Sequence, residues 1–576
     1  MEESAVYMFP TSIKEVKALG WDYIDVILFT GDAFVDHPSF GTAVIARWLQ
    51  KHGYRVAVVP QPNWRDDLRD FRKLGAPRLY FGVNAGAMDS MVNHYTAAKR
   101  LRSDDAYTPE GKAGQRPDYA VTVYTKILKQ IYPDIPVVIG GIEASLRRVT
   151  HYDYWQDCLK PSILVESGAD WLCYGMGERT MIEFTKAIES GRNVNDIRKI
   201  PQLGFYMDGR CKLKDAVILN SYERCTKDKV AFAENFHVVE TYANMLTPPV
   251  LVEPVGNGYV QINPTWPPAT QAEMDSFWDL PFTKLPHPRY KGKHIPAFEM
   301  IKFSVNTHRG CFGGCNFCTI AAHQGKFIQS RSEDSIIKEI KGLNGLPGFA
   351  GNISDVGAPT ANMYGMKGKN PDLCAKCRRK SCLFPAPCKN MDRSHERLLK
   401  LYDRIAGVKG IKHAYIGSGI RYDLFLDEKG YVDETSYPYL KELILEHTSG
   451  RLKVAPEHTE DSVLKLMAKP SFKLFERLRI EFDNIVRSSG RKCELVPYFI
   501  SGHPGCGMRE MQRLSRNPAL KGLYMDQVQD FTPTPMTTSS VMYYTGLDPK
   551  NLDKLFVERD IERKREQKSF FFRRSK

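Results

Sequence analysis

The stretch Arg309-Gly-Cys-Phe-Gly-Gly-Cys-Asn-Phe-Cys318 places three cysteines at the spacing C-x3-C-x2-C, with glycines among them. Three thiolates this close together can hold one side of a cubane iron–sulfur cluster, and glycines permit the backbone angles that such a loop requires. One iron then has no protein ligand and is open to a small molecule, as catalytic metal sites keep one position free. The spacing therefore predicts a reactive [4Fe-4S] site at Cys311, Cys315 and Cys318.

These cysteines have a second interpretation as zinc ligands, because C-x2-C is one half of many zinc sites. Such sites usually contain two cysteine pairs, whereas this stretch has three cysteines with unequal gaps. The spacing therefore favours iron–sulfur chemistry over a structural zinc ion.

Length and composition describe a globular protein. The chain has 576 residues, 42% hydrophobic and 26% charged, which predicts two to four domains at roughly 150 residues each. Residues 1–7 lack the features of an export signal, and no apolar run has the length of a membrane helix. Thirteen cysteines without an export signal indicate a reducing compartment. We therefore expect a cytoplasmic protein with no membrane partner, whose cysteines serve metal or redox chemistry.

The formal net charge of +14 makes nucleic acid a candidate partner. Much of the excess charge lies in a cysteine-rich insert and in the C-terminal run 563–574. A charged terminus is commonly a solvated one. Three adjacent phenylalanines, Phe570 to Phe572, would also suit docking on the body of the protein or on a partner. The sequence leaves both interpretations of the tail open.

Residues 1–195 alternate between strand-like and helix-like segments. This alternation predicts a doubly wound, Rossmann-like α/β domain whose ligand site lies at the carboxyl ends of parallel strands. Residues 196–295 are rich in proline and aromatic residues, which predicts an extended connecting linker with few regular elements. The expected strands of the first domain are 25–30, 55–60, 78–83, 136–141 and 170–175, and the expected helices include 41–52 and 119–131.

The alternation resumes in residues 296–546, and a basic tail follows at 547–576. Six strand and helix units predict a partial (β/α)6 barrel with its active site at the carboxyl ends of the strands. The cysteine triplet comes directly after the first of these strands. The expected strands are 302–307, 352–355, 413–417, 452–455, 494–500 and 526–531.

A second cysteine group lies in an insert at residues 366–392. Its spacing is Cys374-x2-Cys377-x4-Cys382-x5-Cys388. Four cysteines can fill every coordination position of a metal, which suits either a structural zinc ion or an auxiliary iron–sulfur cluster. The sequence predicts metal binding here and does not choose between the two.

The cysteine triplet with its flanks, together with Gly417-Ser-Gly-Ile-Arg-Tyr-Asp423, resembles the uncharacterised YgiQ family of radical S-adenosylmethionine (SAM) enzymes. The resemblance extends to about Gly546. It implies that the open iron binds SAM, and that one electron from a donor such as flavodoxin or ferredoxin cleaves SAM to a 5′-deoxyadenosyl radical. The substrate and any further catalytic residue are not implied.

The resemblance also assigns SAM-binding residues. It implies that Phe317 lies against the adenine, that the turn containing Gly351, Asn352 and Ser354 binds the methionine amine, and that Glu457 binds the ribose. The acidic Gly-Gly-Glu motif common in radical SAM enzymes is absent after the second strand of the barrel.

The first domain resembles the cobalamin-binding-type domain that precedes many radical SAM cores. Cobalamin binders that ligate cobalt through histidine carry Asp-x-His-x-x-Gly, whereas this chain has Asp36-His-Pro-Ser-Phe-Gly41. The spacing is broken on both sides of His37. We therefore infer the fold and not the cobalamin cofactor.

Two other functions compete with a general radical SAM enzyme. The basic charge and the methylthiotransferase-like segments 455–470 and 499–505 would suit an RNA-modifying radical SAM enzyme. The insert and the basic tail would suit a zinc-dependent nucleic-acid-binding protein.

Overall fold

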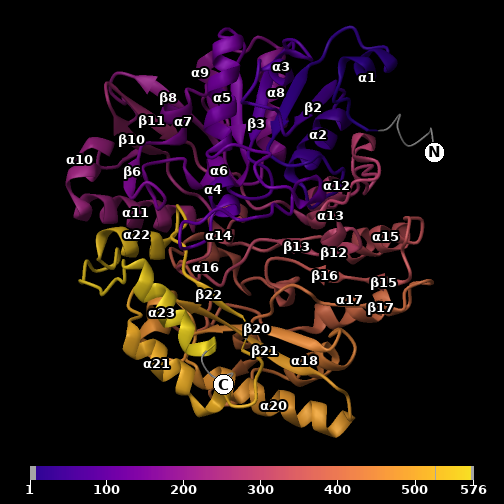
Figure 1. The fold of residues 1–576 in the computed structure, drawn as a ribbon, viewed down its shortest axis with the longest axis vertical. Helices are drawn as coiled ribbons and strands as arrows, with labels where there is room; N and C mark the ends of the chain where they lie inside the picture. The colour runs from indigo at the N-terminus through magenta and orange to yellow at the C-terminus, as the bar shows by residue number, and fades with distance from the viewer. Residues whose placement is uncertain (1–7, 526, 573–576) are drawn as a thin grey trace.

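The computed structural model describes residues 8–525 and 527–572. Residues 1–7, Asp526 of the last expected strand, and Arg573 and Arg574 of the basic tail lie outside the described residues. An N-terminal half and a barrel half are stacked along the longest axis, and α14 and β13 lie where they meet (Figure 1). None of the described helices is both long and apolar enough to cross a membrane.

The N-terminal half contains a nine-stranded sheet among its described residues, in the order β2-β1-β3-β4-β7-β8-β11-β10-β9. Its first five strands run parallel, and the residues of three of them are buried throughout, as expected for a sheet covered on both faces. All five expected strands are confirmed. They are β1 (Val26–Thr30), β2 (Val56–Pro60), β3 (Tyr80–Asn84), β4 (Val137–Gly140) and β7 (Trp171–Cys173), with helices α2 (Gly41–Lys51), α5 (Ala120–Ile131), α6 (Gly141–Leu146) and α8 (Glu178–Glu189).

The expectation of an extended linker at 196–295 is wrong for much of that range, because four further strands continue the sheet. The proline content of this range favoured a linker over strands and led to the wrong prediction. Pro254 of β10 pairs with Tyr259 on one side only, because β9 on the other side ends at Ile218, opposite Val252. A position without a partner tolerates a residue that lacks an N–H group. The elements are β8 (Leu203–Asp208), β9 (Val217–Ile218), β10 (Leu251–Val255), β11 (Gly258–Ile262), α10 (Tyr222–Lys227), α11 (Lys229–Ala243) and α12 (Gln271–Trp278).

The barrel half has the six expected strand positions, and neighbouring strands pair in parallel. A parallel bridge between Ile420 and Val454 continues the arc between its third and fourth strands. No described strand pairs the last strand with the first, so the barrel is open. The strands are β12 (Ser304–Asn306), β15 (Asn352–Ile353) with β16 (Asp355–Gly357), β17 (His413–Ala414), β20 (Arg451–Glu457), β21 (Glu494–Ser501) and β22 (Val528–Asp530).

Helices on the outside of this arc bury their apolar faces in one shared core. This core includes the fully buried side chains Ile340, Leu401, Leu443 and Phe475. The helices are α15 (Glu333–Leu343), α17 (Glu396–Ala406), α18 (Ser436–Leu445), α19 (Asp461–Met467), α20 (Lys473–Ser489) and α21 (Met508–Arg516).

The C-terminal segment docks on the protein, which settles the alternative that the sequence left open. Helix α22 (Thr538–Thr545) packs on α11 of the N-terminal half, and α23 (Ile561–Phe572) packs on α21 and β22 of the barrel (Figure 1). Within α23, Gln567 is fully buried and Lys564 is 5% exposed. Burial lowers the pKa of Lys564 to about 8. This lysine is therefore not a free surface charge for nucleic acid.

Gln567→Ala is expected to destabilise the docked helix by about 1–3 kcal/mol, because Gln567 Oε1 accepts the buried N–H of Gly502 over 3.0 Å and alanine leaves that donor unpaired. The measurement is protease resistance of the C-terminal segment together with the thermal midpoint. Lys568→Ala is the control, since Lys568 Nζ lies 3.6 Å from Asp530 in a partly exposed pair. Equal effects of the two substitutions would contradict the prediction.

Candidate functional site

The cysteine loop, residues 310–319, leaves the carboxyl end of the first barrel strand by way of the short strand β13 (His308–Arg309) and leads into α14 (Ile320–Gln324). Two of its glycines have positive φ angles and no room for a side chain. A Cβ atom on Gly310 (φ 90°) would lie 2.3 Å from the carbonyl oxygen of Phe327, and one on Gly314 (φ 64°) would lie 2.7 Å from the Cβ of Ser381. This path of the loop therefore requires glycine at both positions.

The three thiols of the loop face one small cavity. Cys311, Cys315 and Cys318 all line a space of about 60 Å³. Burial, reinforced by the thiols of Cys315 and Cys311, raises the pKa of Cys318 to about 12. Thiols bind metals after losing their protons, and three sulfurs around one space match the ligand set of an iron–sulfur cluster.

No group of three or more His, Cys, Asp or Glu side chains in residues 8–525 and 527–572 is arranged to hold a single metal ion. In a cubane cluster each cysteine ligates a different iron, so the sulfurs need not converge on one point. The donor set of the cysteine loop thus fits a cluster better than a single zinc ion.

An arginine contacts the middle cysteine. Arg421 Nη1 donates to the sulfur of Cys315 over 3.2 Å, while its Nε and Nη2 donate to the Asp423 carboxylate over 2.9 and 2.5 Å. The Asn362 side chain fixes the backbone of Arg421 through two hydrogen bonds of 2.9 Å. The sequence indicates this segment only through its family resemblance and does not predict the contact of Arg421 with a cysteine. An Arg-x-Asp pair inside a glycine-rich turn was the available signal.

Glu457 lies close to the cysteine loop, as the sequence analysis expects for a residue at the end of the fourth barrel strand. Burial raises the pKa of Glu457. The charge of Glu457 in turn adds to the raised pKa of Cys318, after the larger effects of burial and of the other two thiols. Lys469 Nζ lies 3.8 Å from its carboxylate. The structure brings Glu457 to the cysteines, and its contact with a ribose stays a prediction.

Phe317 forms part of the wall of a different cavity, of about 650 Å³, that lies between the two halves. Its ring meets the ring of His503 edge to face, with centroids 6.3 Å apart. Met300, which precedes β12, and Asp530 of β22 line the same cavity. Phe317 therefore adjoins both the cysteines and a space large enough for a small molecule.

The structure does not bring Gly351, Asn352 and Ser354 to the cysteines. The Ser354 N–H donates to the carbonyl of Phe303 over 3.1 Å, just before β12 begins, so these residues lie at the amino ends of the strands. The cysteine loop lies at the carboxyl ends. There the hydroxyl of Thr360, which follows β16, is 3.4 Å from Cys311 Sγ. Because the active site of such a barrel lies at the carboxyl ends of its strands, strand direction alone would have predicted that residues after β16, such as Thr360, lie near the cysteines.

The four cysteines of the insert gather beside the cysteine loop. Burial is the main cause of the rise in the pKa of Cys382 to about 11, and the thiols of Cys388, Cys377 and Cys374 add to it. The N–H of Cys382 donates to the carbonyl of Phe312, the residue after Cys311, over 3.0 Å. Metal binding by these cysteines stays a prediction.

A further cavity, of about 520 Å³, lies at the carboxyl edge of the N-terminal sheet and faces α14. Its wall includes the glycine pair Gly140-Gly141. His37 is not among the lining residues; it is buried, and its Nδ1 accepts the N–H of Ser39 over 3.1 Å. Burial lowers the pKa of His37 to about 3, so the imidazole is neutral. His37 therefore does not lie where it would ligate a cobalt ion in this cavity.

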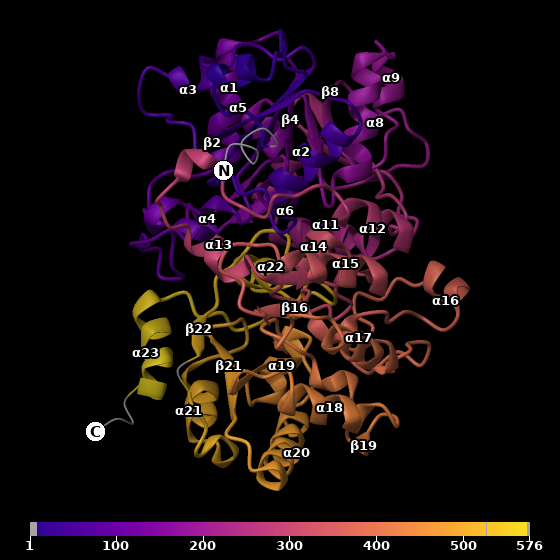
Figure 2. The same ribbon diagram turned by 90° about the vertical axis from the view of Figure 1, so that its right-hand side faces the viewer.

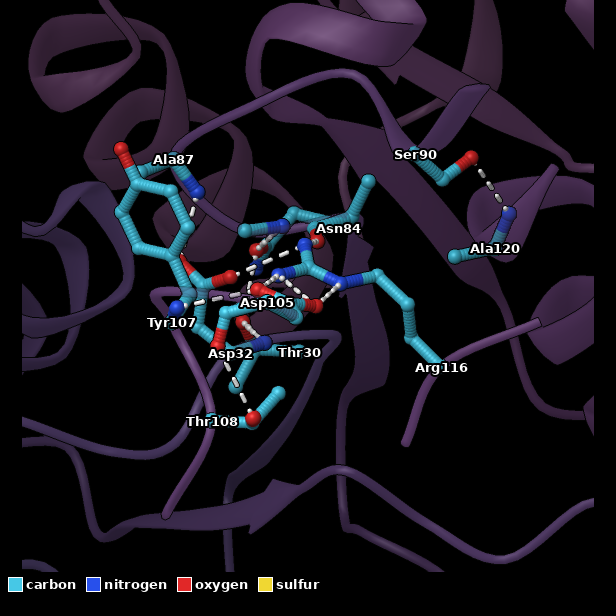
Figure 3. Close-up of polar contacts among 12 residues, drawn as sticks. Thr30, Asp32, Asn84, Ala87, Ser90, Asp105, Tyr107, Thr108, Arg116 and Ala120 are labelled. Atoms are coloured by element: carbon cyan, nitrogen blue, oxygen red, sulfur yellow. Dashed lines mark hydrogen bonds and ion pairs between the residues drawn. The ribbon is translucent and has the colours of Figure 1, made fainter. Parts of the chain in front are cut away.

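A buried ion-pair network fixes the loops at the same edge (Figure 3). Arg116 Nε and Nη2 donate to Asp105 over 3.0 and 3.1 Å, and its Nη1 lies 3.0 Å from Asp32 and donates to the carbonyl of Ala85 over 2.7 Å. Asp32 accepts the N–H of Ala87 over 2.7 Å. Burial raises the pKa of Asp32 to about 6, although Arg116 opposes the shift. The network joins the loops after β1 and β3, where the strand order reverses and ligands of such sheets bind.

The N-terminal half covers the cysteine loop through a buried ion pair. Arg309, two residues before Cys311, places Nη2 2.5 Å from Glu178 of α8, and its guanidinium lies 4.5 Å from the centre of the Trp278 ring. His323 Nδ1 of α14 lies 3.1 Å from the Ser145 hydroxyl. Both contacts join the loop that carries the cysteines to the carboxyl edge of the N-terminal sheet.

Comparison with known proteins agrees with this architecture. The family model described as Radical SAM N-terminal matches residues 8–304. A UPF0313 protein of Bacteroides thetaiotaomicron is 51% identical and covers 98% of this chain and 93% of the relative. The chain belongs to the UPF0313 family. Another UPF0313 member, YgiQ of Escherichia coli K12, is 42% identical over 94% of this chain and 79% of the relative, so the expected YgiQ resemblance is confirmed. A domain of unknown function, DUF3362, matches residues 526–574 of this UPF0313 protein.

Among solved structures, the UPF0313 chain is similar to the radical SAM methyltransferase TsrM of Kitasatospora setae, solved with cobalamin and a [4Fe-4S] cluster bound. The identity is 15%, the TM-score is 0.49, and the match covers 90% of this chain and 74% of TsrM. The family match places the UPF0313 chain in the radical SAM superfamily independently of this similarity.

Glu178→Gln is expected to cost about 3–5 kcal/mol of stability, because it leaves the largely buried Arg309 guanidinium without its carboxylate. The measurement is the thermal unfolding midpoint. Asp334→Asn removes a carboxylate that is 86% exposed from its pair with Arg404 and is the control, expected to cost about 0–1 kcal/mol. A midpoint shift no larger than that of the control would contradict the structural role of the pair.

Arg421→Gln is expected to make the cluster harder to reduce, because an N–H group donated to a ligand sulfur stabilises the more negative reduced state. The lost charge-assisted contact is worth about 1.5–3 kcal/mol. A redox titration followed by electron paramagnetic resonance measures the midpoint potential. Arg393→Gln is the control, since Arg393 reaches only the main-chain oxygen of Asp423, at 3.4 Å. An unchanged potential at full iron content would refute the assignment.

Proposed function

We propose that this UPF0313 protein is a radical SAM enzyme whose [4Fe-4S] cluster is held by Cys311, Cys315 and Cys318. When bound, the cluster and SAM supply one-electron cleavage to methionine and a 5′-deoxyadenosyl radical, which takes hydrogen from a substrate. The observation that carries the proposal is the meeting of three partly buried thiols in one cavity at the carboxyl edge of a parallel six-strand barrel.

The chain's own residues bind and orient these groups. Arg421 donates to the Cys315 sulfur and offsets thiolate charge. Glu457 offers a carboxylate acceptor to the SAM ribose, and Phe317 offers an aromatic face to the adenine. The turn 351–354 has no part in this proposal, because it lies at the opposite ends of the strands.

The cavity of about 650 Å³ beside Phe317 is the place where the substrate meets the radical. It is bounded by loops of the N-terminal half and by the ends of β21 and β22. We therefore assign substrate selection to residues of both halves.

The test is anaerobic reconstitution with iron and sulfide, followed by reduction in the presence of SAM. The expected products are methionine and 5′-deoxyadenosine, measured by liquid chromatography and mass spectrometry. The triple variant Cys311→Ala, Cys315→Ala, Cys318→Ala is expected to lose the cluster and all product, because no other thiols line this cavity among the described residues. Cys158→Ala, at an exposed cysteine, is the matched control. A triple variant that still forms 5′-deoxyadenosine would refute the proposal.

A further inference from the structure

The insert, residues 366–392, has an inner side that contacts the cysteine loop. The hydroxyl of Ser381 donates to the carbonyl of Gly313 over 2.7 Å, next to the hydrogen bond from Cys382 to Phe312. Cys311 and Cys382 pack against the same apolar cluster, which contains Phe312, Met363, Met366, Leu383 and Leu424. The two cysteine groups are therefore neighbours across a shared apolar wall.

Donors of the kind that tune iron–sulfur clusters point at the insert's sulfurs. Asn390 Nδ2 donates to the Cys374 sulfur over 3.3 Å. Lys326, which is 2% exposed, places Nζ 3.8 Å from the Cys377 sulfur and donates to the carbonyl of Arg379 over 2.5 Å. Lys326 lies two residues after the end of α14, so one short segment connects the cysteine loop to the insert's sulfurs. Hydrogen bonds to sulfur help to set the potential of a cluster.

The outer side of the insert is exposed and basic. Helix α16 (Pro371–Ala375) stands at the edge of the molecule in Figure 2. The exposed acidic residues of the insert are Asp372 and Asp392. They are outnumbered by the exposed basic residues, which are Lys367, Lys369, Lys376, Arg378, Arg379 and Lys389.

We propose that the insert holds a second iron–sulfur cluster through Cys374, Cys377, Cys382 and Cys388, and that this cluster passes electrons from an acidic one-electron carrier protein to the cluster of the cysteine loop. In each transfer the carrier is oxidised by one electron, the loop cluster is reduced by one electron, and the insert cluster returns to its starting state. The basic outer side attracts the acidic carrier, and the inner side delivers the electron. This inference rests on the proposed function.

A redox role explains features that a structural zinc ion would not need. The backbone of the insert joins its cysteines in pairs: the N–H of Cys377 donates to the carbonyl of Cys374 over 3.1 Å, and the N–H of Cys388 donates to the carbonyl of Cys382 over 2.7 Å. A zinc ion has no redox chemistry, so it could not pass electrons from the basic surface to the cysteine loop. An iron–sulfur cluster in the insert would receive electrons at the basic outer side and deliver them at the inner side.

The first test is metal analysis of the full-length protein after anaerobic purification. The expected result is iron and sulfide for two clusters, no zinc, and two electron paramagnetic resonance signals on reduction. Cys377→Ser with Cys388→Ser is expected to keep one cluster only. Stoichiometric zinc in the wild-type insert would overturn the proposal.

The second test separates the electron route from the chemistry. Formation of 5′-deoxyadenosine is measured with reduced flavodoxin and, separately, with dithionite, a small reductant that can reach the loop cluster directly. Lys376→Glu with Arg378→Glu is expected to slow the flavodoxin-driven rate about tenfold or more, because charge reversal repels an acidic carrier, and to leave the dithionite-driven rate intact. Lys291→Glu with Lys293→Glu makes the same charge change at an exposed site outside the insert and is the control.

An unchanged flavodoxin-driven rate in the charge-reversal variant would overturn the inference, even where the double cysteine variant fails to fold. Absence of 5′-deoxyadenosine with dithionite in the wild type would instead overturn the proposed function. The two failures are therefore distinguishable.

Discussion

The structure depends on holding three neighbouring, partly buried thiols at one cavity where its two halves meet. Burial raises the pKa of Cys311 and Cys318, so these thiols stay protonated unless a metal takes the place of the proton. Glycines without space for side chains fix its backbone, and the Arg309–Glu178 pair ties it to the N-terminal sheet. The position of every other candidate group follows from this loop.

One lysine shows how distant segments meet around the loop. Lys380 of the insert donates to Glu240 of α11, to the Asn316 side chain of the cysteine loop over 2.7 Å, and to Thr538 of α22 over 2.5 Å. The N-terminal half, the barrel, the insert and the C-terminal segment are all joined at this ammonium group. The region matched by DUF3362 is thus part of the enclosure of the site and not an appended tail.

The cysteine loop has different surroundings on its two sides. Toward Phe317 the loop adjoins the cavity between the halves, which suits a substrate. Toward Cys311 it adjoins the insert and its basic outer side. In the function that we propose, substrate and reductant therefore approach the cluster from different sides, and the chain order alone does not reveal this separation.

The sequence by itself determined the cysteine spacing, the family, and the strands of both parallel sheets, because these depend on local periodicity and on residues a few positions apart. Only the tertiary structure decided the rest. Proline content concealed β8 to β11, because local propensity disfavours a proline in a strand, whereas Pro254 stands where β10 has no partner on one side. Arg421 and Lys326 reach the sulfurs through contacts between segments far apart in the sequence, which local periodicity does not reveal. The turn 351–354 was assigned from the family resemblance, and it lies at the ends of the strands opposite to the cysteines.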